Sequence, residues 1–433
     1  MGLVASTAAL ATTLRLVIGA ANRVLIARLL SIDNFAVVGL AQQFVSLSLV
    51  LGSAGIPVWI YYHTLSRLDK DSADFRLIVY KSIFLLVKSI SLCALSLLLV
   101  LCAALIYGWL PLKLIVAVLC LFPYLILAPL TEMILACCQS LRHPFSASLL
   151  LLSEAAFRLV LLCAASLASS SGLVGLAFVP CLMSASAIVT AIVATRLFFT
   201  RLGFSPREFI SRFKDHSTLR IDFSDYSSSF KYGAPTIVGA LADTFPLALA
   251  FFEYNVTVAA VFSCFKEFIN VLSSIFQYTA RTLLPWARKP SSWRRAAPIL
   301  LVAATSIILF NVYISDRVFG FLLSSLYPVY SGYIVKNVGF YVASALVASC
   351  AFGLFKLFCL RIGKVTVVLI AQILGAITIP VALSASLQIE SASQHMFFTG
   401  QLGVIVSRSL LFSFVAALIV GIVGLKGHLK YLK

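Results

Sequence analysis

Long apolar stretches recur along this chain from its first turn to its last. Residues 92–107, LCALSLLLVLCAALIY, contain no charged side chain. A helix rises about 1.5 Å per residue, so about 20 such residues cross the ~30 Å hydrocarbon core of a bilayer. Hydrophobic residues make up 61% of the 433 residues and charged residues only 11%, whereas soluble domains average about 45–50% and about 25%. The sequence therefore predicts an integral membrane protein.

Helices are the spanning element that fits these stretches. A membrane β-strand would alternate apolar and polar positions over ~10 residues, and the long stretches here are apolar on every side. Only helices then satisfy the backbone hydrogen bonds inside lipid. We predict an all-α fold with about twelve transmembrane helices, six and six, near residues 7–30, 36–62, 77–107, 113–138, 145–168, 172–198, 229–253, 256–283, 297–315, 333–359, 365–388 and 400–425.

Basic residues predict the orientation and the domain boundaries. The loops on one side of the predicted spans hold more than seventeen Lys and Arg, and the opposite loops hold little beyond Lys113 and Arg317. The Lys/Arg-rich side is cytoplasmic, which puts both termini in the cytoplasm. We predict an N-lobe at 1–198, a basic cytoplasmic linker at 199–228 and a C-lobe at 229–433. The linker is basic and amphipathic, which suits contact with anionic headgroups.

An internal repeat supports two lobes. Residues 17–41 align without gaps on residues 237–261, an offset of 220, which pairs Gly19 with Gly239 and Asp33 with Glu253. Six predicted spans separate the two copies, so both lobes would have the same orientation. Two six-helix bundles related by a pseudo-two-fold axis along the membrane normal follow from this arrangement.

Ionisable residues inside the predicted spans point to function. Each costs ~2.5–3.5 kcal/mol at membrane depth, so such residues usually face a cavity or a partner. Glu154 and Arg158 are four residues apart on one helix, a spacing that lets them neutralise each other. Other basic residues lie near span ends, where they can reach headgroups. The remaining deep residues are Arg15, Arg23, Lys88, Asp243, Lys266, Glu267 and Arg408.

This deep set is mainly cationic. Arg15 and Arg23 are eight residues apart, which is ~80° around a helix and ~12 Å along it. Successive cations in a low-dielectric cavity favour an anionic passenger such as a phosphate or diphosphate, so we expect Arg15, Arg23, Lys88, Lys266 and Arg408 to bind it. Internal pairing or packing around water is the alternative for each. Asp243 and Glu267 could couple transport to an ion, but charge balance for Lys266 is the favoured interpretation.

No pattern in the sequence predicts an enzyme. Walker A, HExxH and GxSxG motifs are absent, and the five histidines lie in loops or near span ends. The ten cysteines show no metal-binding spacing and are interpreted as packing residues. We therefore expect no catalytic residue, no cofactor and no metal. The net charge of +18 lies largely in loops, so it does not indicate a nucleic-acid partner. Prolines in the spans predict kinks at Pro123, Pro129, Pro180, Pro235, Pro246 and Pro380.

The stretch LRLVIGAANRVLIARLLSIDNFAVVGLAQQFVSLSLVLGSAGIP at 14–57 resembles the opening helix pair of Wzx-type polysaccharide flippases. These flippases belong to the multidrug/oligosaccharidyl-lipid/polysaccharide (MOP) exporter superfamily. It shares the basic first helix, the "ARLLS" exit and the glycine-rich end of the second helix. KYGAPTIVGALADTF at 231–245 is similar to the seventh helix of that family. The resemblance covers the chain in length and span number, and its motifs are diffuse.

The resemblance implies two MATE-like six-helix bundles working by alternating access in a bacterial inner membrane. The implied passenger is an undecaprenyl-diphosphate-linked oligosaccharide for O-antigen or a similar surface polysaccharide. Implied partners are membrane lipids, H⁺ or Na⁺ as a coupling ion, and polysaccharide polymerase and chain-length proteins. A cationic cavity lined by the first helix of each lobe would put Arg15, Arg23, Asp243 and Lys266 closest to the passenger, with Arg408 a weaker placement.

Three alternatives remain open. A cation-coupled multidrug exporter of the same superfamily would use acidic residues in an early helix, but span 1 has three arginines and no acid. A lipid II flippase would typically have fourteen spans. A polysaccharide polymerase or ligase would ordinarily carry a large periplasmic loop, and none is evident.

Overall fold

The computed structural model describes residues 2–67, 73–141, 143–168, 176–214 and 223–249, and short stretches between 251 and 376. The regular elements in these ranges are helices, and no strand occurs among them. The chain divides into two compact units, one of residues 1–30 and 37–240 and a second of residues 31–36 and 241–433. The helices considered below belong to the first unit, except for the first residues of α2 and the last turns of α10. The predicted lobe boundaries stay predictions.

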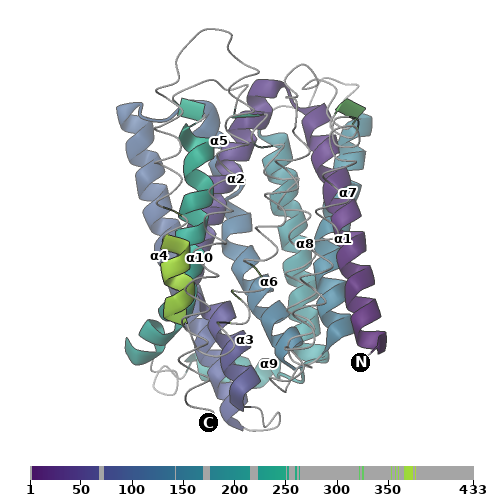
Figure 1. The fold of residues 1–433 in the computed structure, drawn as a ribbon, viewed down its shortest axis with the longest axis vertical. Helices are drawn as coiled ribbons and strands as arrows, with labels where there is room; N and C mark the ends of the chain where they lie inside the picture. The colour runs from purple at the N-terminus through teal and green to yellow at the C-terminus, as the bar shows by residue number, and fades with distance from the viewer. Residues whose placement is uncertain are drawn as a thin grey trace. The chain divides into compact units, whose positions relative to one another are not determined.

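Three helices make up the first two predicted spans (Figure 1). Helix α1 runs over Gly2–Leu29, α2 over Ile32–Ser53 and α3 over Ile56–Arg67. The helix is interrupted inside the span predicted at 36–62, because Ala54 and Gly55 have φ angles of 47° and 74°. Two successive residues in the left-handed region end a right-handed helix. Pro57 lies in the first turn of α3, where its missing N–H has no cost.

Five helical segments of the described ranges are long and apolar enough to cross a membrane, namely Ile32–Ser53, Phe75–Tyr107, Leu112–Ser140, Phe145–Leu167 and Phe178–Thr200. They comprise α2, α4 (Ala73–Tyr107), α5 (Leu112–Cys120) with α6 (Phe122–Ser140), α7 (Pro144–Ala168) and α8 (Phe178–Thr200). Near the kink predicted at Pro123 the helix is interrupted: α5 ends at Cys120, and Pro123 lies in the first turn of α6. Pro129 lies inside α6.

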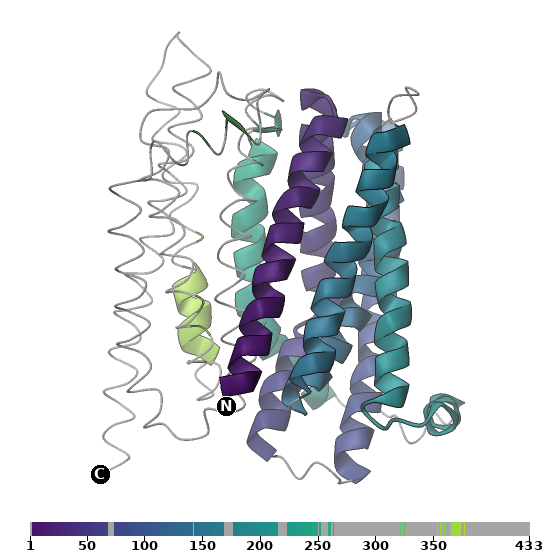
Figure 2. The same cartoon turned by 90° about the vertical axis from the view of Figure 1, so that its right-hand side faces the viewer.

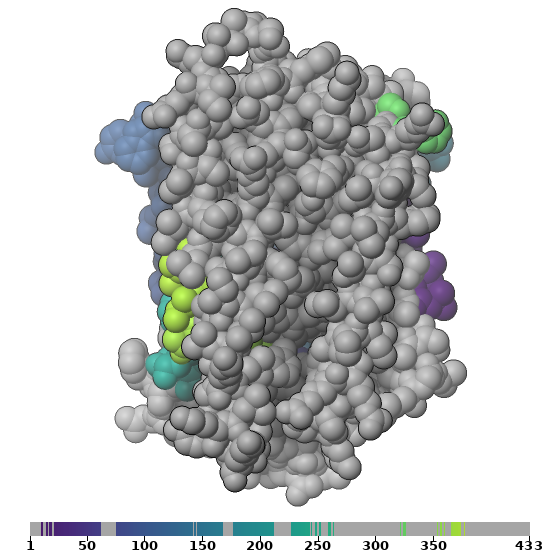
Figure 3. Space-filling model, in the orientation of Figure 1, coloured from purple at the N-terminus to yellow at the C-terminus, as the bar shows by residue number. Residues whose placement is uncertain are grey.

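Helix α4 is apolar on its outside as well as its inside. Tyr80 and Leu86 are fully buried, whereas Leu92 and Leu99 are exposed. A soluble helix would place polar residues on the exposed side, so this pattern indicates contact with lipid. At the end of α4, Tyr107 and Trp109 stack with ring centres 5.1 Å apart, as in the aromatic belts of membrane interfaces. Atoms of the α4–α5 region, coloured blue, project at the edge of Figure 3.

The predicted linker at 199–228 is partly helical. It contains α9 (Pro206–Lys214), and α10 (Phe223–Leu249) begins six residues before the predicted span at 229. Subtracting the 220-residue repeat offset from the bounds of α10 gives 3 and 29, within one residue of the bounds of α1, Gly2–Leu29. The described residues of the two repeat copies, 17–29 and 237–249, therefore lie in helices, α1 and α10.

Candidate functional site

An ion pair lies at the middle of α7. Arg158 Nη2 donates to Glu154 Oε1 over 2.6 Å, and the two side chains are only 16% and 26% exposed. The neutralisation predicted from their four-residue spacing is confirmed. The Arg158 guanidinium carbon also lies 6.0 Å from the ring centre of Tyr124 on α6, within reach of a cation–π interaction.

Tyr124 is surrounded by ionisable groups from three helices. Its hydroxyl interacts electrostatically with Glu154 and Arg158 of α7, with Glu132 of α6 and with Arg15 of α1. Arg15 is partly buried, and its Nη1 atom is buried. We call Arg15, Tyr124, Glu132, Glu154 and Arg158 the Tyr124 cluster. It brings the predicted binding residue Arg15 together with the predicted ion pair.

Arg23 belongs to a second polar group on α1. Its Nη1 atom donates to Gln42 Oε1 of α2 over 2.7 Å. Gln42 is buried, and its Nε2 atom lies 2.8 Å from Met183 Sδ on α8. This chain of contacts fixes the orientation of the Arg23 side chain and links α1, α2 and α8.

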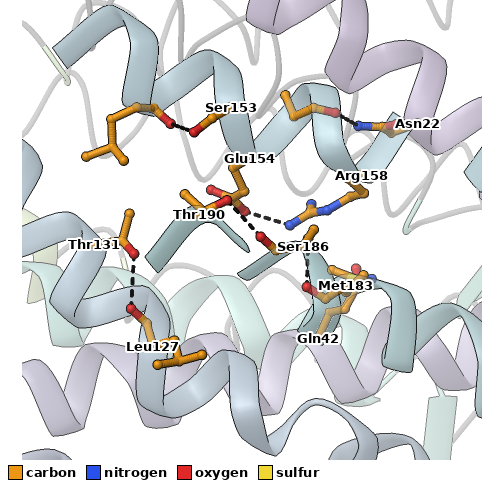
Figure 4. A network of polar contacts seen from close by, with 12 residues as sticks. Asn22, Gln42, Leu127, Thr131, Ser153, Glu154, Arg158, Met183, Ser186 and Thr190 are labelled. Atoms are coloured by element: carbon orange, nitrogen blue, oxygen red, sulfur yellow. Dashed lines mark hydrogen bonds and ion pairs between the residues drawn. The ribbon is translucent and has the colours of Figure 1, made fainter. Parts of the chain in front are cut away.

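Asn22 joins α1 directly to the helix of the ion pair. Its Nδ2 atom donates to the Ala155 carbonyl oxygen of α7 over 3.1 Å, and the residue is only 4% exposed. Helix α7 packs against both α1 and α8, and polar residues of all three helices surround Glu154 and Arg158 in Figure 4. The ion pair therefore lies within a polar region between helices.

The other predicted site residues are placed only in part. Lys88 is exposed on α4, with its Nζ atom 4.4 Å from the ring centre of Phe84. Asp243 lies within α10, and only its backbone is described. Lys266, Glu267 and Arg408 lie outside the described residues. A role for these residues in binding stays a prediction.

The uncharged members of this region are not among the predicted site residues. Asn22, Gln42 and Tyr124 are polar side chains in otherwise apolar spans, and Asn22 and Gln42 are buried. A buried amide costs ~1–3 kcal/mol without a hydrogen-bond partner, so each should mark a polar contact between helices. A search for isolated Asn and Gln, as well as for charges, would have found two of the three.

Arg15 and Arg23 place guanidinium groups on α1, and Arg158 places one on α7. Arg158 is paired with Glu154, the only acid of these two helices, whereas Arg15 belongs to the Tyr124 cluster and Arg23 is hydrogen-bonded to Gln42. Arg158 Nε is buried, and no described residue accepts its hydrogen bond. Guanidinium groups bind phosphate oxygens in a fork geometry.

Comparison with known proteins supports the fold. No family model and no curated protein matches the sequence. Solved structures do match. One is an outward-facing multidrug resistance MATE family transporter of the MOP superfamily, with 12% identity and a TM-score of 0.69 over 99% of this chain and 95% of that one.

A MOP superfamily transporter from Pyrococcus furiosus, described as having a binding pocket of reverse polarity, matches with 13% identity and a TM-score of 0.69 over 99% of this chain and 95% of that one. The eukaryotic MATE transporter AtDTX14 matches with 15% identity and a TM-score of 0.59 over 97% and 94%. Sequence identities this low support a shared fold and do not extend to function. The chain is thus a multi-pass membrane protein with the all-α fold of the MATE transporters of the MOP superfamily.

Proposed function

We propose that this chain is a flippase, a transporter that moves an undecaprenyl-diphosphate-linked oligosaccharide across a bacterial inner membrane. Movement runs from the cytoplasmic to the periplasmic leaflet by alternating access, and the oligosaccharide is a repeat unit of O-antigen or a similar surface polysaccharide. A polysaccharide polymerase and chain-length proteins would act on the product. Arg15 and Arg23 of α1 bind the diphosphate, together with Lys266 and Arg408.

The observation that carries this proposal is the charge of α1. Its charged residues are Arg15, Arg23 and Arg28, with no acid among them. Arg15 joins the Tyr124 cluster, and Arg23 is held by Gln42 over 2.7 Å. Gln42 is neutral, so this hydrogen bond orients the Arg23 guanidinium without itself bringing a negative charge next to it.

The fold accommodates binding sites of different polarity, which also supports the proposal. One structural neighbour is a multidrug resistance transporter, and another is described as having a pocket of reverse polarity that suggests a different function. Architecture therefore leaves the passenger open, and the side chains of each member decide it.

A binding experiment separates the two main functions. Undecaprenyl diphosphate, the part common to such passengers, should raise the unfolding temperature of the purified full-length protein, and the cationic dye ethidium should not. Arg23→Ala should lower the affinity for undecaprenyl diphosphate about tenfold or more, because one charge-assisted hydrogen bond is worth about 1.5–3 kcal/mol. The control is Arg28→Ala, at the exposed end of the same helix, which should bind normally.

The second candidate, a cation-coupled multidrug exporter, is favoured by Glu132, an exposed acid on α6 in the Tyr124 cluster. It predicts the opposite result: stabilisation by ethidium, loss of that effect in Glu132→Gln, and no response to undecaprenyl diphosphate.

If the chain is the proposed flippase, Arg23→Ala and Lys266→Ala should reduce surface polysaccharide in cells at normal protein levels. Normal polymer in both variants would contradict the site assignment.

A further inference from the structure

Helix α9 is attached to the ends of α4 and α8 by aromatic side chains. Phe204, in the turn before α9, stacks on Phe198 of α8 with ring centres 4.2 Å apart and planes at 8°. It also meets Tyr80 of α4 edge-on at 5.6 Å. Phe209 of α9 lies 5.7 Å from Tyr80 and 6.1 Å from Phe199. Such pairs contribute about 0.5–1.5 kcal/mol each beyond the area they bury, so α9 is held at a defined place.

That place is the edge of the membrane. The apolar segment of α8 ends at Thr200, and α9 begins at Pro206. The apolar segment of α4 begins at Phe75, whose ring lies 6.3 Å from that of Phe204. Figure 2 shows α9 nearly end-on, at the foot of α8, so its axis runs across the spans. A helix lying across the ends of two spans is at the level of the lipid headgroups.

The outer face of α9 combines an apolar residue with basic ones. Phe209 is half-buried against the bundle, but Ile210 is 55% exposed and Arg207 is exposed. Arg207 and Ile210 are three residues apart, which puts them on one side of the helix. An exposed aliphatic side chain between basic residues is the pattern of helices that lie in the interface plane.

The surroundings of α9 are also basic. Segments 73–81 and 196–214 hold seven Lys and Arg against two acids. One of the acids, Glu208, is 3.9 Å from Arg76. Arg196, Arg201 and Arg207 are exposed at this end of the bundle. A positive surface at headgroup level attracts anionic lipid, at about 1 kcal/mol for each basic residue near the membrane.

We propose that α9 binds the anionic phospholipid headgroups of the bilayer that surrounds the protein. Ile210 inserts at the boundary between headgroups and acyl chains, and Arg201 and Arg207 contact phosphates. The aromatic contacts of Phe204 and Phe209 transmit this attachment to α4 and α8. This attachment does not depend on the passenger, because its residues lie at the ends of these helices rather than in the Tyr124 cluster.

Tryptophan quenching in vesicles tests the proposal. Full-length Ile210→Trp protein is reconstituted with brominated phosphatidylglycerol in ordinary phosphatidylcholine, or with brominated phosphatidylcholine in ordinary phosphatidylglycerol, at equal bromine content. The signal of the unsubstituted protein, with its four native tryptophans, is subtracted. Quenching of the added tryptophan should be at least about twofold stronger with the brominated anionic lipid. High salt should reduce this preference, because ~1 M salt shortens the screening length to ~3 Å.

Charge variants complete the test. Arg207→Gln in the Ile210→Trp background should bring the ratio of quenching by brominated phosphatidylglycerol to quenching by brominated phosphatidylcholine toward one. Lys113→Gln makes the same charge change at an exposed position beside the other end of the α4 segment, and it should leave the ratio unchanged. Equal quenching by both lipids overturns the proposal, as does an equal effect of the two variants. Quenching by neither lipid also overturns it and is the result expected if this face binds an acidic protein.

Discussion

Glu154 and Arg158 form an ion pair of 2.6 Å on α7, with side chains 26% and 16% exposed. A second pair, Arg76 and Glu208, is longer at 3.9 Å, and its side chains are 50% and 29% exposed. Removing one partner from a buried pair leaves an uncompensated charge, which is strongly destabilising, whereas exposed pairs are worth little. The two pairs therefore make a matched comparison within one protein.

Double-mutant cycles should separate the two pairs. In the Glu154→Gln, Arg158→Gln cycle, each single variant should lower the free energy of unfolding. The loss in the double variant should be smaller than the sum of the two single losses by about 1–3 kcal/mol. The Arg76→Gln, Glu208→Gln cycle should give about 0–1 kcal/mol. Chemical unfolding in detergent micelles measures both, and additive losses at Glu154 and Arg158 would contradict the structural role assigned to that pair.

Among the elements, the break between α2 and α3 fits closely against α10. Gly55 there has a φ of 74°, and a side chain on it would clash with the backbone of Gly233 on α10 and lie 2.7 Å from Ser229 O. A Cβ on Gly233 would lie 2.7 Å from Gly55 Cα and N. The two backbones thus meet where neither residue has a side chain, which holds α10 against the break.

Gly233→Ala should therefore destabilise the protein by about 1–3 kcal/mol, the usual cost of overpacking. The loss would occur although alanine favours a helix over glycine by about 1 kcal/mol. Gly19→Ala is the control, because a Cβ on Gly19 in α1 meets nothing within 4 Å, and it should be neutral or stabilising. Unfolding temperatures in detergent would decide, and equal values for Gly233→Ala and the unsubstituted protein would rule out the close contact.

At the scale of the whole molecule, the net charge of +18 has two parts. Most basic residues lie in the loops assigned to the cytoplasm, and their orientation is still a prediction. A smaller group lies within the spans, where the structure places Arg15 and Arg23 in different polar groups. Under the proposed function, only the second group would bear on the passenger, because loop charges set orientation.

Thiol labelling in cells tests the orientation. With a membrane-impermeant maleimide, Lys113→Cys should be labelled in intact cells, and Arg201→Cys only after the membrane is permeabilised. Both positions are exposed, and the native cysteines lie in apolar stretches that a polar reagent does not enter. Labelling of Arg201→Cys in intact cells would reverse the predicted topology.

The sequence by itself determined the class of fold, because apolar stretches of this length have no stable alternative to membrane helices. It also predicted the Glu154–Arg158 pair, since helical spacing makes such contacts local. Contacts between helices were decided by the tertiary structure alone. The pairing of Arg23 with Gln42 joins residues 19 positions apart, and that of Gln42 with Met183 joins residues 141 apart. The break at Ala54 and Gly55 likewise occurs where α10 meets the chain at Gly233. Residue periodicity within one helix predicts which face is polar, but the packing of the helices determines which neighbour this face contacts.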